Sequence, residues 1–215
     1  GIKVGLFTSA VHLSPRLASL ILPHLSWIRF NLSAPNRQAY LRIHGVDLFD
    51  QVVENIIHSV HLRNDQNLSV KLGIGCVLKR EHTDLGDIGS LTRLAGHLNL
   101  DFIQFKHDLN EMGMVENENW WGREALPHLR AAKNANDSAT TIDYSENTYS
   151  RTSKEPCFIV KRMAAVKADG TVCLCKLHRD TTSMEVGNLN NTSFREIWLN
   201  ARRKEILAKL EREGC

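Results

Sequence analysis

The chain has 215 residues, of which 42% are hydrophobic, and its 27 Lys and Arg side chains nearly balance its 24 Asp and Glu side chains, leaving a net charge of +3. This composition supports one core plus a small satellite domain and excludes disorder throughout. The charges are mixed along the sequence, and no apolar run reaches the roughly 20 residues of a membrane helix. We therefore expect a cytoplasmic protein with no nucleic-acid partner and no membrane partner.

Strands alternate with helices in the first half of the chain. Apolar residues over 2–8 predict a strand, and Ser14 followed by Pro15 is typical of the start of a helix. The same pattern predicts strands over 27–33, 69–78 and 101–106 and helices over 47–62 and 84–98. Such alternation indicates parallel strands joined by helical crossovers.

The two faces of these strands differ in polarity. In the strand over 27–33 the apolar positions are Ile28, Phe30 and Leu32, and the positions between them are Arg29, Asn31 and Ser33. An open doubly wound sheet buries both faces and has strands that are apolar on both. A sheet with helices outside and a polar interior fits better. We predict an α/β fold with a partial (β/α) barrel, and the open sheet is the competing architecture.

The second half of the chain changes in composition. Residues 114–153 are rich in Asn, Glu, Ser and Thr and predict a linker with one short helix near 123–133. After it we expect a hairpin that turns at residues 168–170 and a final helix that Ser193 and Glu196 open as a capping box and Gly214 closes.

Three parts follow from these patterns: a partial barrel over 1–113, the linker over 114–153 and a small α+β cysteine-rich domain over 154–215. The chain starts at Gly1 inside an apolar run and stops at Cys215 directly after a predicted helix. We interpret it as a segment of a longer protein.

Four of the five cysteines gather in the small domain: Cys157, Cys173, Cys175 and Cys215. An odd number of cysteines in a reducing compartment favours metal ligation over a disulfide framework. Thiolates that a hairpin and a helix end bring together can hold zinc or an iron–sulfur cluster, and the spacing does not choose between them. It also leaves open which of Cys173 and Cys175 is a ligand, and the alternative is that all four are buried apolar side chains.

Three other features bear on a site. Cys76 lies on the apolar face of its strand, so we expect a packed core thiol. Gln104 and Lys106 face the predicted interior near the carboxyl end of a strand, where barrel active sites lie, so we predict that they contact substrate. The alternative for these two is a solvated strand end. The aromatic pair Trp120 and Trp121 is expected either to cover the barrel mouth or to anchor the core.

A family resemblance rests on several short motifs. In the C-terminal part these are Cys157, Gly170 and Cys175, followed by Gly187-Asn188-Leu189 and Ser193-Phe194-Arg195-Glu196-Ile197-Trp198. Their order resembles the SPASM or Twitch extension of radical S-adenosylmethionine (SAM) enzymes. Upstream, Phe7-Thr8-Ser9 is similar to that family's Thr-Asn-Gly strand end, and residues 29–34 are similar to its Arg-x-Ser-Leu-Asp-Ala segment.

The resemblance implies a set of site residues. The positions implied to contact SAM are Thr8, Ser9, Asn31, Ser33, Gly73 and Gly75. The implied ligands of an auxiliary 4Fe-4S cluster are Cys157, Cys173, Cys175 and Cys215. The chain departs from the family pattern at two places, because Asn31 replaces a serine and Ser33 replaces an aspartate.

The resemblance also implies an activity. The intact protein is expected to be an oxidoreductase that generates a 5'-deoxyadenosyl radical at a second 4Fe-4S cluster and abstracts hydrogen from a peptide or small-molecule substrate. A reductant such as flavodoxin or ferredoxin is implied as a partner. The Cys-x-x-x-Cys-x-x-Cys motif that binds this second cluster is absent from the 215 residues, so we expect this segment alone to be inactive. Two alternatives stay open: a non-catalytic cluster-binding module derived from that family, and a structural protein stapled by zinc.

Overall fold

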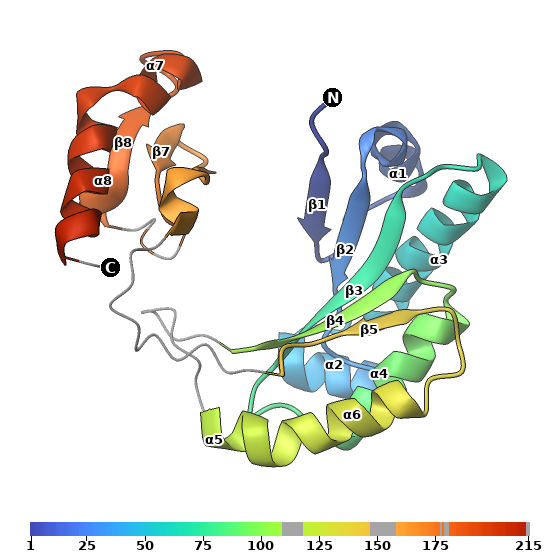
Figure 1. The fold of residues 1–215 in the computed structure, drawn as a ribbon. Helices are drawn as coiled ribbons and strands as arrows, with labels where there is room; N and C mark the ends of the chain where they lie inside the picture. The colour runs from blue at the N-terminus through green and yellow to red at the C-terminus, as the bar shows by residue number, and fades with distance from the viewer. Residues whose placement is uncertain (109–117, 147–157, 177, 179–180, 214–215) are drawn as a thin grey trace. The chain divides into compact units, whose positions relative to one another are not determined.

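The computed structural model describes residues 1–108, 118–146, 158–176, 178 and 181–213. The described residues form two compact units, one up to Glu146 and the other from Phe158 onward (Figure 1). No helix in the described ranges is long and apolar enough to cross a membrane.

A parallel sheet forms the base of the first unit. Its strands are β1 (Gly5–Thr8), β2 (Trp27–Asn31), β3 (Lys71–Leu78), β4 (Phe102–His107) and β5 (Thr141–Asp143). They lie side by side in chain order, and every neighbouring pair is parallel. An open doubly wound sheet reverses its strand order at a switch point, and this sheet does not. The predicted partial barrel is therefore confirmed.

Helices cover one face of this sheet (Figure 1). They are α1 (Pro15–Ile21), α2 (Arg37–His44), α3 (Phe49–Asp65), α4 (Gly86–His97) and α6 (Leu126–Asn134), with short turns at η1 (Leu22–His24), α5 (Glu118–Trp120) and the π-helical η2 (Trp121–Ala125). Local sequence sets where they start, because the Ser14 side chain accepts a hydrogen bond from the Leu17 amide and that of Asn36 accepts one from the Ala39 amide.

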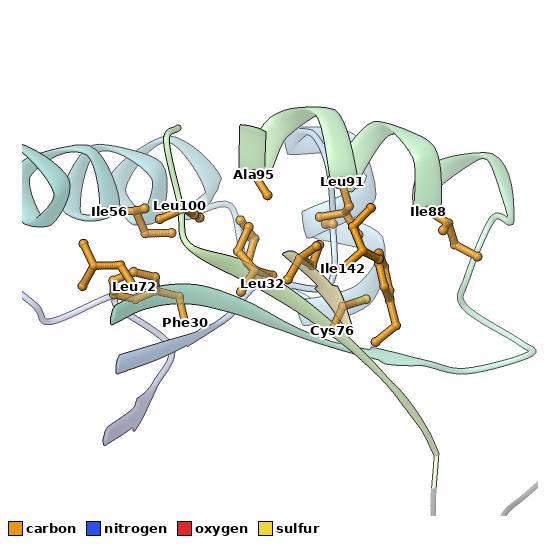
Figure 2. Packing of buried hydrophobic residues seen from close by; sticks show 14 of the residues in the cluster. Phe30, Leu32, Ile56, Leu72, Cys76, Ile88, Leu91, Ala95, Leu100 and Ile142 are labelled. Carbon is orange, nitrogen blue, oxygen red and sulfur yellow. The ribbon is translucent and has the colours of Figure 1, made fainter. Parts of the chain in front are cut away.

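The hydrophobic core lies between the sheet and these helices, as Figure 2 shows. Ile28, Phe30 and Leu32 are fully buried on the helix-covered side, whereas Asn31 is exposed. Burying each large apolar side chain contributes about 1.5–3 kcal/mol to folding. The alternation read from the sequence thus separates an apolar face that stabilises the unit from a polar face that is left for other tasks.

Helix α6 and strand β5 both lie within the span 114–153, which the sequence predicts as a linker. The Thr140 hydroxyl donates to the Leu100 carbonyl at 2.8 Å, and the Thr141 amide donates to the Asp101 carbonyl at 2.9 Å. Ile142 is buried against the core. The polar composition hides β5, since Ile142 is the single apolar residue among its three.

The aromatic pair near the start of this span anchors the core. Trp120 and Trp121 are both buried, and the Trp121 ring lies against the ring of His107 with centroids 3.7 Å apart. The Trp121 indole also donates to the Ser145 carbonyl at 3.3 Å. The core-anchor interpretation of the pair is therefore correct.

A small antiparallel sheet organises the second unit. It consists of β6 (Ala165–Val166), β7 (Thr171–Cys173) and β8 (Glu185–Asn188), with helical turns at η3 (Phe158–Lys161) and η4 (Thr182–Met184). The predicted hairpin is confirmed, because β6 and β7 pair around a turn in which Gly170 has a φ of 83°. The Asp169 carboxylate stabilises this turn by accepting from the Thr171 amide at 2.9 Å.

Two helices, α7 (Phe194–Leu199) and α8 (Ala201–Glu213), follow β8. The predicted capping box of Ser193 and Glu196 is confirmed, but a single final helix is wrong. Asn200 interrupts it with an extended backbone, caps α8 by accepting from the Arg203 amide at 2.8 Å and donates to the Val186 carbonyl at 2.7 Å. The predicted stop at Gly214 lies outside the described residues.

We expect Gly73→Ala to destabilise the first unit. A Cβ on Gly73 would lie 2.4 Å from the Phe102 ring, so the ring or the strand must move, at a cost of about 1–3 kcal/mol. The matched control is Gly122→Ala, where the added carbon meets nothing within 4 Å. Urea unfolding of the two variants measures the difference, and equal midpoints for Gly73→Ala and the unaltered chain would contradict this packing.

Candidate functional site

A hollow of about 260 Å³ opens on the polar side of the sheet, at the carboxyl ends of its strands. We call it the carboxyl-end hollow. Its lining residues are Phe7, Thr8, Ser9, Arg29, Asn31, Gly75, Cys76, Val77 and Lys106. Parallel strands all end at the same edge of a sheet, so short segments far apart in the sequence converge there. No acidic residue is among these lining residues from the described part of the chain.

Arg29 is the central charged group of this face. Its Nη1 donates to the Gln104 side-chain oxygen, and its guanidinium carbon lies 3.9 Å from the centroid of the Phe7 ring. Gln104 in turn donates to the Asp143 carboxylate at 2.6 Å. A row of contacts therefore runs across the sheet from β1 to β5. Partial burial lowers the pKa of Arg29 from its usual value, but an arginine stays charged in proteins.

The space for this row comes from Gly75. In the strand register Gly75 lies beside Asn31 on one neighbour and Gln104 on the other. A Cβ at Gly75 would lie 2.6 Å from the Arg29 Nε, so any larger residue would push the guanidinium away. Because Gly75 has no side chain, Arg29 reaches across β3 to Gln104 on β4.

The residues predicted to contact SAM fall in two groups. Thr8, Ser9, Asn31 and Gly75 all line the carboxyl-end hollow. Gly73 lies farther from the strand ends, beneath the Phe102 ring. The fold thus brings four predicted residues from three separate segments to one place.

Ser33 is the remaining predicted SAM contact. It is buried, and its hydroxyl accepts a hydrogen bond from the Val77 amide at 3.3 Å. The same hydroxyl acts to lower the pKa of the Cys76 thiol. In this position Ser33 ties the end of β2 to β3.

The predicted substrate residues divide in a similar way. Lys106 lines the hollow, whereas Gln104 lies between Arg29 and Asp143. Phe7 and Arg29 also line the hollow and were not among the predicted contacts. The alternating polarity of its strand already places Arg29 on the polar face. That Gln104 is its partner can be known only from the register of the strands.

A larger hollow of about 1110 Å³ lies at the opposite, amino ends of β3, β4 and β5. Two of the cations that line it form ion pairs with Asp101, Arg63 at 2.6 Å and Lys71 at 2.7 Å. Burial acts to raise the pKa of Asp101, but hydrogen bonds from Lys71 and the Leu72 amide and the charge of Arg63 outweigh it, so the pKa is lowered. Conserved chemistry in parallel barrels lies at the carboxyl ends instead. We assign this end a structural role.

The thiol of Cys76 belongs to the core. The side chain is buried in the main hydrophobic cluster, and burial raises its pKa to about 12 even though the Ser33 hydroxyl acts in the opposite direction. A neutral, buried thiol is a poor nucleophile and a poor metal ligand. The expectation of a packed core thiol is confirmed.

Cys173 and Cys175 lie within three residues of each other in the second unit, and both are buried. Cys175 packs in the small hydrophobic cluster of this unit, whereas Cys173, at the end of β7, does not belong to that cluster. Cys157 and Cys215 lie outside the described residues. Within the described ranges no three Cys, His, Asp or Glu side chains are placed to hold one metal ion.

Comparison with known proteins gives a family for the second unit. Residues 157–215 match the model of SPASM, an iron–sulfur cluster-binding domain. This segment contains all four of the cysteines predicted as ligands. No curated protein sequence matches the chain.

Solved structures of SuiB from Streptococcus suis share the fold. SuiB alone matches with a TM-score of 0.68 at 10% sequence identity, over 93% of this chain and 49% of that one. SuiB bound to S-adenosylmethionine matches with 0.68 at 11% identity, and SuiB bound to the precursor peptide SuiA with 0.70 at 10%; both matches cover 93% of this chain and 48% of that one. The chain therefore spans about half the length of SuiB. The SPASM part of the predicted resemblance is confirmed by the family model, and the match to SuiB confirms the predicted fold.

We expect Cys76 to resist alkylation in the folded protein. With a pKa of about 12, only about one thiol in ten thousand is ionised at pH 8, and its burial also excludes the reagent. A short pulse of N-ethylmaleimide followed by peptide mass spectrometry measures the labelling, with the chain in urea as the positive control. Labelling of folded Cys76 as fast as in urea would show that the thiol is accessible.

Proposed function

Because residues 157–215 carry a SPASM iron–sulfur cluster-binding domain and the chain has the fold of SuiB, we propose that it is part of a radical SAM enzyme that modifies a peptide. In this proposal the first unit binds SAM at the carboxyl-end hollow. The second unit holds an auxiliary 4Fe-4S cluster. A small flavodoxin or ferredoxin serves as the reductant.

The observation that carries the proposal is the convergence of the predicted SAM contacts. Thr8 and Ser9 from the end of β1, Asn31 from β2 and Gly75 from β3 line the same hollow. Two hydroxyls and an amide suit the ribose hydroxyls and the amino-acid part of SAM, which offer both hydrogen-bond donors and acceptors. When bound, SAM supplies the 5'-deoxyadenosyl group that abstracts hydrogen from the substrate.

The donor set of the second unit suits an iron–sulfur cluster. Cluster ligands in proteins are mostly Cys thiolates, and Cys173 and Cys175 offer two thiols from one buried stretch. Cys157 and Cys215, which lie in the SPASM-matched segment, complete the proposed set.

We expect Cys175→Ala to lower the bound iron and acid-labile sulfide by at least half, because the variant loses one thiolate of the proposed set. Cys76→Ala is the matched control, since it also removes a buried thiol but one that lies in the other unit. Metal analysis after anaerobic reconstitution gives both values. Equal iron in the two variants would remove this assignment, and bound zinc without sulfide would favour the structural zinc protein.

We also expect the 215-residue chain not to cleave SAM under reducing conditions. It contains no Cys-x-x-x-Cys-x-x-Cys motif to bind the cluster that reduces SAM. Chromatography for 5'-deoxyadenosine after incubation with dithionite tests this, with a complete radical SAM enzyme as the positive control. Formation of 5'-deoxyadenosine would contradict our placement of the chain within such an enzyme.

A second candidate function is consistent with the same SPASM match. A protein that binds SAM or a cluster without the reducing site would be a non-catalytic module derived from this family. The sequence of the natural gene distinguishes the two: the motif upstream of Gly1 supports the enzyme, and a start codon directly before Gly1 supports the module.

A further inference from the structure

Arg29 presents hydrogen-bond donors to the carboxyl-end hollow that no described residue accepts. Its Nη1 donates to Gln104, and its Nε and Nη2 make no hydrogen bond to a residue in the described ranges. The Asp143 carboxylate binds Gln104, so it approaches Arg29 only through that amide. Among the described residues, no acidic side chain forms an ion pair with Arg29. A partly buried cation thus faces the hollow with its charge incompletely balanced.

The guanidinium is also held in place. The Phe7 ring stacks on it at 3.9 Å, and Gln104, itself fixed by Asp143 at 2.6 Å, holds one nitrogen. These contacts leave Nε and Nη2, the two donors that together match the two oxygens of a carboxylate. A donor pair that is fixed before the ligand arrives loses little conformational entropy on binding.

The surroundings favour an anion. Lys106 adds a second cation to the lining, and its Nζ lies 6.0 Å from the Phe7 ring centroid. Among the described residues that line the hollow, none is acidic. Thr8 and Ser9 supply neutral hydroxyls. A cation held in a concave surface raises the local concentration of negative groups.

We propose that Arg29 binds a carboxylate of the substrate, namely the side chain of an Asp or Glu in the peptide. This inference rests on the proposed function for the statement that the substrate is a peptide. The alternative source of the same chemistry is the carboxylate of SAM. The substrate is favoured by backbone position, because Arg29 precedes Asn31 by two residues on the same face of β2, and its backbone lies deeper in the sheet than that of Thr8, Ser9 and Asn31 at the strand ends.

Binding of two small probes to the chain tests the proposal without any reaction. The probes are the capped tripeptide acetyl-Gly-Glu-Gly-amide and its Gln counterpart, and ligand-observed NMR gives the affinities. We expect the Glu peptide to bind at least about tenfold more tightly than the Gln peptide. The Glu carboxylate forms a hydrogen-bonded ion pair with Arg29, whereas the neutral Gln amide forms weaker hydrogen bonds. Arg29→Gln should abolish the preference and Arg29→Lys should keep part of it. Arg16→Gln, on exposed α1, is the matched control and should change nothing.

A second pair of probes identifies the source of the carboxylate. SAM and decarboxylated SAM differ by this group alone, so we expect Arg29→Gln to leave their relative affinity unchanged. A loss of the preference for SAM in Arg29→Gln, with the peptide preference intact, would overturn the proposal and assign Arg29 to SAM. Equal binding of the Glu and Gln peptides to the unaltered chain would overturn it as well.

A failure of the Arg29 site can be distinguished from a failure of the iron–sulfur assignment. A chain that discriminates between the two peptides but binds no iron and sulfide would refute the iron–sulfur assignment and leave the Arg29 site standing. A chain that binds the cluster without discriminating would refute the Arg29 site alone. Circular dichroism of each variant confirms that it is folded before its affinities are compared.

Discussion

Two glycines on β3 determine what the polar face of the first sheet can hold. A Cβ would lie 2.4 Å from the Phe102 ring at Gly73 and 2.6 Å from the Arg29 Nε at Gly75. Large side chains of the two neighbouring strands therefore lie flat across β3 instead of projecting from the sheet. The hydrogen bond between Arg29 and Gln104, which links β2 to β4, depends on this gap. The position of the guanidinium at the hollow also depends on this gap.

The opposite face explains why such an arrangement is tolerated. The described helices of the first unit all pack on the apolar side, where a continuous cluster of buried side chains extends from β2 to β5 (Figure 2). Stability comes mainly from this side, so the polar face carries a desolvated charge without threatening the fold. The single alternation of β2 serves both purposes, since Phe30 packs in the core while Arg29, its neighbour in sequence, faces the site.

Much of this arrangement could be predicted from the sequence, because it depends on local or periodic signals. Alternating polarity identified the four longer strands, and the convergence of Thr8, Ser9 and Asn31 followed from the rule that parallel strands end at one edge. Strand β5 could not be predicted, because it has only three residues and its position is fixed by pairing with Gln104 and the neighbouring residues of β4. The break between α7 and α8 at Asn200 could not be predicted for a related reason. Its side chain bonds to Val186 on β8, a contact that no local pattern reveals.

The row from Phe7 to Asp143 was the least predictable part of the candidate site. Each member lies on a different strand, so recognising the row requires the register of four strand pairs. One-residue shifts in register would turn every side chain to the other face. The sequence indicates which residues are polar but leaves their partners open, and the chemistry of Arg29 depends on which partner it has.

The second unit has a small hydrophobic core for a folded domain. In the described part of this unit the hydrophobic cluster has eight buried residues, and its three strands span two to four residues each. A core of this size supplies few kilocalories of net stability, and small domains commonly add a metal site. Cys173 is fully buried yet outside that cluster, so its burial is not explained by apolar packing alone. A cluster bound by these thiols would supply binding free energy that is also folding free energy, and loss of the metal would then unfold the unit that holds it.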